Sequence, residues 1–387
     1  MPIVAVKDML EHAYAHDYAI SAFDLLSLEA LQGIMAAAER CRSPVILNLP
    51  ETQRGCFDFE LLMPALETAA RRCSQPVAIH QQHGIDIDST IRAINSGCNS
   101  VMLDNSQENF ENNIRRTCEV VKLAHACGVP VEGELDSAYR VDEMQHYVAQ
   151  SGVDFLAISS NTVHADSKGE LEPDADRLRQ INKTLKIPLA IYGGADLSED
   201  QCLQFIAHGV AKINHGTALY DTIDSQIRNN ADGHQLGYSK LMTGVSDAVS
   251  IEAEACMRLG RSEGRGAALL AHCTPWSPVE HLIIYNVTDS SEQLVEAMLS
   301  EGRKALATIP GVREVITARA VKNDAKYFYT WLIRFCHPAV IDSYREHPVH
   351  VAFADRLFRP IARDRISIDY QWDDPKSAML SVTETPD

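Results

Sequence analysis

The chain has 387 residues, of which 45% are hydrophobic and 23% charged. This balance is typical of a globular core, and the length predicts two domains. The formal net charge of −18 excludes a nucleic acid or an anionic membrane as the expected partner, because both require a basic face. The sequence contains no apolar run of membrane-spanning length and no signal-peptide pattern at its start.

The cysteines indicate a reducing compartment. The ten cysteines are scattered and form no Cys-x-x-Cys pair. Cys73, Cys98 and Cys202 fall in apolar helical patterns, which is typical of small core residues. We therefore expect a cytoplasmic protein.

Short apolar segments alternate with helical patterns from Tyr18 to about Ile227. In one helical pattern, Leu28, Leu31, Ile34 and Met35 recur at three- and four-residue spacing. The strand candidates are 19–23, 44–49, 76–80, 100–104, 130–135, 155–159, 188–192 and 211–214. Apolar strands separated by helices predict a parallel sheet covered on both faces, and this many repeats favour a closed (β/α)8 TIM barrel. The alternative, a doubly wound open sheet, would need a glycine-rich turn after the first strand, and AFDLLSLEA has none.

The remaining chain predicts a second, smaller domain. The barrel domain is predicted over 1–271 and ends in a helical extension, and a proline-containing linker follows over 272–278. Residues 279–375 read β-α-β-β-α-β, the order of a ferredoxin-like α+β domain, with a tail over 376–387. The open sheet of such a domain leaves a face or edge that dimerisation commonly covers.

Polar groups follow most predicted barrel strands, at the ends where barrel enzymes carry their active sites. The strand-end set is Asp24, Asn48, His80, Gln82, His83, Asp104, Glu134, Asp136, Asn161, His164, Tyr192, Gly193, Gly194, Asn214, His215 and Thr217. Imidazoles and carboxylates that converge in one mouth indicate a divalent-metal site, although any barrel also has a solvated polar rim. Gly193 and Gly194 could admit a phosphate that Lys168 neutralises, or could form only a tight turn.

The barrel segment resembles the class II, metal-dependent fructose-bisphosphate aldolases. The stretches that carry the resemblance are AFDLLSLEALQGIMAAAE, IHQQHG, GCNSVMLDNS, AHACGVPVEGELD, NTVHADSK, PLAIYGGAD and GVAKINHGT. The resemblance implies a catalytic zinc on three histidines and an aspartate that transfers the proton. It also implies that the metal polarises a ketose carbonyl while a carbon–carbon bond breaks or forms.

The resemblance implies metal-binding or substrate-binding roles for several positions of this chain. His83 and His164 match zinc histidines, and Asp104 and Glu134 match acidic positions near the metal. The positions that match substrate and phosphate contacts are Asn214, Lys168, Gly193, Gly194 and Thr217. The resemblance also implies a small-molecule substrate and zinc as the expected metal.

Other positions depart from the family pattern. Tyr192 stands where the third zinc histidine is expected, and Gln82 stands where the catalytic aspartate is expected. Ala195 and Gly216 replace a serine and an aspartate of the substrate site. Because a glutamine amide cannot exchange protons as a carboxylic acid does, Tyr192 or Asp142 is the candidate acid/base.

The missing ligand has three candidate replacements, namely His80, Glu134 and His215. These departures predict a lyase of the aldolase type that acts on a carbonyl substrate other than fructose 1,6-bisphosphate.

The last hundred residues resemble the stress-responsive α/β-barrel (Dabb) domains. HLIIYNV, SYREHPVHV and DYQW carry the resemblance. In that family two ferredoxin-like subunits pair their sheets into one barrel, and a few members cyclise polyketide-like substrates. His281, Tyr344 and His347 match the polar cavity positions, and His350 follows them in the pattern. A purely structural role for these histidines is the alternative.

Three functional hypotheses follow. In the first, the barrel is a lyase with a modified metal site. In the second, the Dabb cavity carries the chemistry as a cyclase or isomerase. In the third, the chain is a non-catalytic pseudo-aldolase that binds a metabolite and oligomerises. Both domains offer interfaces, so a homodimer or homotetramer is expected.

Overall fold

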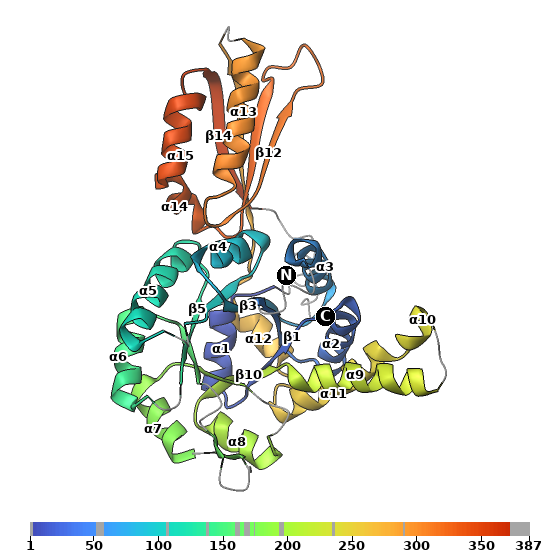
Figure 1. Cartoon of the computed structure of the whole chain (residues 1–387). Coiled ribbons are helices and arrows are strands. Elements are labelled where there is room, and N and C mark those ends of the chain that lie inside the picture. Colours follow the sequence, from blue (N-terminus) through green and yellow to red (C-terminus); the bar gives the residue numbers. More distant parts are fainter. Residues whose placement is uncertain are drawn as a thin grey trace, which may run out of the picture.

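The computed structural model describes residues 3–51, 58–105, 108–136, 139–158, 163–165, 171–173, 175–192, 197–233, 237–288 and 291–371, with only the backbone at 163–165, 171–173 and 175. A closed parallel barrel and a separate antiparallel sheet form its two parts (Figure 1). This arrangement confirms the predicted TIM barrel followed by a ferredoxin-like domain. None of the described helices is long and apolar enough to cross a membrane.

The barrel strands match the predicted segments. They are β1 (Ile20–Asp24), β2 (Val45–Pro50), β3 (Val77–Gly84), β4 (Ser100–Leu103), β5 (Val131–Leu135), β6 (Phe155–Ile158), β9 (Leu189–Tyr192) and β10 (Val210–His215). The helices between and after them are α2 (Leu28–Cys41), α3 (Phe59–Arg72), α4 (Ile87–Ser96), α5 (Phe110–Ala126), α6 (Val141–Ser151), α7 (Ala175–Leu185), α8 (Glu199–Ala207) and α9 (Thr217–Asp232). A short hairpin of β7 (Val163–Ala165) and β8 (Leu171–Pro173) lies between β6 and α7.

Local signals place several helix starts. The Ser27 side chain accepts a hydrogen bond from the Ala30 amide, and Asp86 forms a reciprocal capping box with Ser89. Such caps satisfy amide groups that have no partner within the helix. The helices therefore begin at defined points after their strands.

An N-terminal helix that the sequence did not predict closes the barrel at the ends where its strands begin. Helix α1 (Val6–Ala15) buries Met9 and Leu10 in one cluster with Ile20, Ile46 and other strand residues. The barrel is therefore filled at this end, and the open mouth lies at the opposite, C-terminal ends of the strands. Three further helices, α10 (Tyr238–Leu241), α11 (Val245–Leu259) and α12 (Gly266–His272), complete the barrel domain.

The C-terminal domain has the ferredoxin-like strand order. Its elements are β11 (Val279–Val287), α13 (Glu292–Leu306), β12 (Val312–Arg319), β13 (Tyr329–Phe335), α14 (Val340–Glu346), α15 (Pro348–Phe353), the π-helical turn Ala354–Phe358 and β14 (Ala362–Gln371). The antiparallel sheet has the order β12-β13-β11-β14, with helices on one face.

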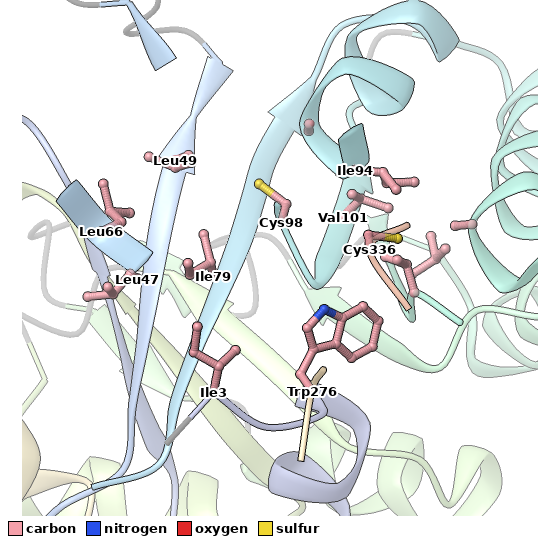
Figure 2. Close-up of a cluster of buried hydrophobic side chains, with 14 of the residues drawn as sticks. Ile3, Leu47, Leu49, Leu66, Ile79, Ile94, Cys98, Val101, Trp276 and Cys336 are labelled. Carbon is pink, nitrogen blue, oxygen red and sulfur yellow. The ribbon is translucent and has the colours of Figure 1, made fainter. Parts of the chain in front are cut away.

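The two domains share a packed junction. Trp276, in the connecting segment, stacks on His337 with ring centroids 4.5 Å apart. Figure 2 shows Trp276 and Cys336 beside Ile94 and Val101 of the barrel. The segment between the domains is thus part of a continuous core and does not act as a free linker.

The junction lies at the N-terminal side of the barrel. The Asn95 side chain donates to the carbonyls of Ala307 and Ile309 at 3.2 and 3.1 Å, and its oxygen accepts from the Gly311 amide at 2.7 Å. Arg313 pairs with Glu67 at 2.7 Å. Asn95 lies in the last turn of α4, just before β4 begins. The C-terminal domain is therefore fixed to the outer helices α3 and α4, near the end where β4 begins (Figure 1).

Candidate metal centre and active site

The end of β3 projects two side chains into the mouth. Its pairing with β4 shifts register between Gln81 and Gly84, and His83 has a φ of 52°, in the left-handed region that costs energy for a residue with a side chain. Because the strand kinks here, the side chains of the consecutive residues Gln82 and His83 lie close together at the mouth. The Gln82 Nε2 donates to the His83 Nε2 at 3.4 Å.

Three potential metal ligands meet at this mouth. The Nδ1 atom of His83 lies 3.3 Å from the Oδ2 of Asp104 and 3.9 Å from the Oε2 of Glu134. One ligand atom from each residue lies within 4.8 Å of the others. Three different strand ends, those of β3, β4 and β5, therefore contribute to one cluster.

The cluster fits a divalent cation. Among the described residues, the buried Nδ1 of His83 and the buried Oε2 of Glu134 form no hydrogen bond. Burying polar atoms without partners is costly, and an imidazole with two carboxylates is a donor set that divalent metals accept. These residues are therefore suited to hold the metal that the sequence predicted.

Electrostatics at the cluster reflects this crowding. Burial, with the carboxylates of Asp104 and Glu132 nearby, raises the pKa of Glu134 to about 7, although the His83 charge lowers it. Burial acts to lower the pKa of His83, but the carboxylates of Asp104 and Glu134 outweigh it and raise that pKa. The cluster thus holds two groups that titrate abnormally, as functional sites commonly do.

Of the three candidate replacement ligands, only Glu134 faces the mouth. His80 lies deeper, with its Nδ1 2.9 Å from the Ser100 hydroxyl and its Nε2 3.1 Å from Glu132. His215 is buried against the Phe23 ring, with centroids 5.3 Å apart. Both histidines are therefore buried away from the cluster, His80 inside the barrel and His215 against Phe23.

Tyr192 fills the position of the missing histidine. Its ring stacks on His83 with centroids 5.5 Å apart, and its hydroxyl donates to the Met102 sulfur at 3.4 Å. Burial raises the pKa of this phenol well above its ordinary value, so the hydroxyl stays protonated. Tyr192 therefore stacks on the imidazole and directs its hydroxyl to Met102.

The other predicted residues are partly described. Asn214 is buried and donates to the Ile191 carbonyl at 3.1 Å, and Thr217 is exposed in the first turn of α9. Asp142 is exposed near the start of α6 and pairs with Arg140. His164 lies in β7 with only its backbone described, and Asn161, Lys168, Gly193, Gly194 and Ala195 lie outside the described residues.

A charged tier below the mouth was missed by the sequence reasoning. Lys212 donates to Glu132, and both side chains are almost fully buried. Glu132 and Glu134 are two residues apart in β5 and so share a face, which was the available signal. This tier separates the mouth from the apolar end that α1 fills.

The C-terminal domain brings together two of the three residues predicted for its cavity. The Nδ1 of His281 donates to the Asp369 carboxylate at 2.7 Å, and its ring lies 5.9 Å from that of Tyr344. The His350 ring lies 4.4 Å from the Tyr344 ring. His347 instead caps α15, where its Nδ1 accepts from the Val349 amide at 3.3 Å. Asp369 was not recognised from the sequence.

Comparison with known proteins decides the family. Residues 4–265 match the family described as fructose-bisphosphate aldolase class-II. The chain belongs to this family. Residues 279–372 match the stress responsive A/B barrel domain, so this class II aldolase-family chain also carries a Dabb domain.

Individual relatives cover the barrel of this aldolase-family chain. A probable fructose-bisphosphate aldolase of Bacillus subtilis is 35% identical over 56% of this chain and 82% of its own length. A sulfofructosephosphate aldolase of Alkalicoccus urumqiensis is 30% identical over 62% of this chain and 90% of its own. The crystal structure of the YdjI aldolase of Escherichia coli K12 superposes with a TM-score of 0.63 and 28% identity, covering 68% of this chain and 99% of that one.

Proposed function

We propose that the barrel binds a divalent cation and catalyses aldol-type cleavage or formation of a carbon–carbon bond in a carbonyl substrate. The convergence of His83, Asp104 and Glu134 within 4.8 Å, with two buried ligand atoms lacking hydrogen bonds, carries this proposal. His164 is proposed as a further ligand, and Zn²⁺ is the expected ion. When bound, the cation supplies polarisation of the substrate carbonyl.

The chain's own residues orient the substrate and handle protons. The buried Gln82 has an amide oxygen without a partner among the described residues, so it can accept a hydrogen bond from the substrate at the mouth. Tyr192 holds the His83 ring and keeps its own proton. Asp142, ionised and exposed near the start of α6, is the remaining proton-exchange candidate of the two that the sequence offers.

A phosphate on the substrate would lie against the start of α9. In the structure as described, no side chain caps this helix, and its first turn carries no acidic residue. Free amide groups and the helix dipole favour an anion at such a point. Thr217 belongs to this turn, and Asn214 precedes it; Lys168, Gly193 and Gly194 are proposed to complete the phosphate contacts.

The substrate is proposed to differ from fructose 1,6-bisphosphate. Gln82 cannot replace an aspartate in proton transfer, and Tyr192 directs its hydroxyl to Met102. A relative named sulfofructosephosphate aldolase supports the view that substrate choice varies around this scaffold.

A cleavage assay with metal-reconstituted protein tests the proposal. Zn²⁺- or Mn²⁺-loaded protein would be incubated with a panel of phosphorylated ketoses that includes fructose 1,6-bisphosphate and sulfofructose phosphate. We expect cation-dependent release of an aldehyde from at least one ketose other than fructose 1,6-bisphosphate, and its loss in His83→Ala. Cation-independent turnover, or none across the panel, would contradict the proposal.

The Dabb cavity offers a second candidate function, a cyclase or isomerase. The observation in its favour is the Asp369–His281 hydrogen bond beside Tyr344, since a carboxylate orients an imidazole for proton transfer. Turnover of a polyketide-like substrate that is lost in Tyr344→Phe and His281→Ala, but kept in His83→Ala, would favour this function.

The open face of the Dabb sheet supports a proposed homodimer. On β14, the alternate residues Ile366, Ile368 and Tyr370 are 39%, 42% and 46% exposed. An apolar sheet face is a typical contact between subunits. Sedimentation velocity should show a dimer or tetramer. The substitution Ile368→Glu should shift the equilibrium between oligomer and monomer towards the monomer.

A further inference from the structure

Asp24 and Gly216 occupy neighbouring places at the barrel mouth. Strands β1 and β10 pair in parallel with Phe23 opposite His215, so the next residues of each strand, Asp24 and Gly216, lie side by side. A Cβ atom on Gly216 would lie 2.6 Å from the Oδ2 of Asp24. No residue with a side chain can therefore occupy position 216 while Asp24 keeps this conformation.

Neutral donors hold the Asp24 carboxylate at the mouth. The Asn48 amide donates to its Oδ1 at 3.0 Å, and the Tyr220 hydroxyl donates to its Oδ2 at 3.2 Å. Within the described part of the chain, Asp24 forms no ion pair. The side chain is only partly exposed, and each carboxylate oxygen keeps capacity for a further hydrogen bond.

The carboxylate belongs to a rigid polar row. The Asn48 amide also donates to the Asn214 side-chain oxygen at 3.0 Å, and Asn214 donates to the Ile191 carbonyl. The row thus links the ends of β1, β2, β10 and β9. Because strands carry four of these five groups, and only Tyr220 lies on a helix, the Asp24 oxygens are fixed in position before any ligand binds.

We infer that Asp24 supplies the substrate-binding carboxylate that the family carries at position 216, and that it binds a hydroxyl next to the substrate carbonyl. This inference rests on the proposed function. The carboxylate has moved from the end of β10 to the end of β1, and Gly216 provides the space that the move requires. The chain has therefore kept a substrate-binding carboxylate, although the glycine at position 216 suggested that this group was lost.

A hydroxyl-discrimination experiment tests the assignment. Binding of dihydroxyacetone phosphate and of hydroxyacetone phosphate, which lacks the hydroxyl, would be measured by calorimetry on cation-loaded protein. A site that hydrogen-bonds a hydroxyl rejects the analogue without it. We expect the wild type to prefer dihydroxyacetone phosphate by at least about tenfold, and Asp24→Asn to lose most of that preference.

The reciprocal change tests the exchange itself. The double variant with Asp24→Ala and Gly216→Asp, in which the shortened side chain at position 24 leaves room for the new carboxylate, should regain the preference to within about threefold of the wild type. Gly216→Asp alone should bind poorly and unfold at a lower temperature, because its side chain collides with Asp24. Asp224→Asn, an exposed aspartate of α9, is the matched control and should bind as the wild type does.

The outcomes separate the two claims. If the wild type binds the probe with discrimination and folded Asp24→Asn discriminates equally, the inference on Asp24 is wrong and the proposed function stands. If Asp24→Asn loses discrimination and the double variant does not regain it, the hydroxyl contact of Asp24 stands and the exchange with position 216 is wrong. If the wild type binds neither compound, the proposed function fails and removes this inference with it.

Discussion

The Oε2 of Glu134 lies 3.9 Å from the Nδ1 of His83, and both atoms are buried without a hydrogen bond among the described residues. A neutral imidazole that faces this carboxylate is free to donate a lone pair to a cation, which the carboxylate would bind as well. The Asp104 carboxylate, 3.3 Å from the same nitrogen, adds a second negative charge. A divalent cation satisfies all three groups at once.

Loss of the Glu134 charge should weaken cation binding. In Glu134→Gln one carboxylate ligand becomes a neutral amide, so affinity for Zn²⁺ or Mn²⁺ should fall at least about tenfold, as measured by calorimetry. Glu301→Gln changes an exposed glutamate of the other domain and serves as the control. Equal affinity in Glu134→Gln and the control would remove Glu134 from the proposed ligand set.

The buried pair of Lys212 and Glu132 should be needed for stability. Lys212→Met leaves the Glu132 carboxylate buried without its cation, which should cost about 3–5 kcal/mol in urea unfolding. Arg228→Met removes one partner of an exposed pair and should cost less than about 1 kcal/mol. A similar small loss in both variants would show that the interior tier tolerates an unpaired charge.

Two buried groups should each lose their contribution to stability in acid, in two pH windows. Burial lowers the pKa of His80 to about 4, so the contribution of His80 is fully present above pH 6.5 and is lost as pH drops from 6.5 towards 4, while protonation of Glu134, with a pKa of about 7, acts in the opposite direction over this range. Burial would raise the pKa of Glu132, but the Lys212 charge and the His80 contact lower it to about 2, so further stability is lost between pH 4.5 and 2. Urea unfolding across this range measures both windows.

His80→Gln isolates the first window. Glutamine can replace the polar contacts of His80 and carries no titrating group, so the unfolding free energy at pH 4, relative to that at pH 6.5, should be higher in the variant than in the wild type. An unchanged pH dependence would mean that other groups cause the loss.

The junction between domains should depend on Asn95. Asn95→Ala removes three hydrogen bonds and leaves the part-buried backbone amide of Gly311 unpaired. This should lower the free energy of unfolding by about 1–3 kcal/mol. Hydrogen exchange should accelerate at 307–311 while the barrel strands keep their protection. Asn229→Ala, on the exposed face of α9, is the control. Unchanged exchange at 307–311 would indicate that apolar packing at Trp276 suffices.

Much of the fold could be predicted from the sequence because each barrel strand is a short apolar run between amphipathic helices. Helix α1 and the β7–β8 hairpin were not predicted. Helix α1 depends on long-range closure, since its partners include Ile20, Ile46 and Ala78 on three different strands. The side on which the Dabb domain docks was equally inaccessible, because it depends on contacts such as Asn95 with Gly311 that no local pattern reveals.

The candidate site was predicted in part. Strand ends identified His83, Asp104 and Glu134 as neighbours, since a barrel gathers these ends at one mouth. The proximity of Asp24 and Gly216 could not be inferred from local sequence, because it depends on closure of the barrel between its first and last strands. The orientation of Tyr192 towards Met102 depends on side-chain packing in the mouth, which the substitution alone does not specify.

The most direct test of the rebuilt metal centre is the metal content of the purified protein by plasma mass spectrometry. Wild type, His83→Ala, Glu134→Gln and the control Glu301→Gln would be dialysed with Zn²⁺ or Mn²⁺ and then freed of excess ion. We predict near-stoichiometric metal in the wild type and the control, and strong loss in the other two variants. A wild type that retains no metal after this treatment would contradict the central claim.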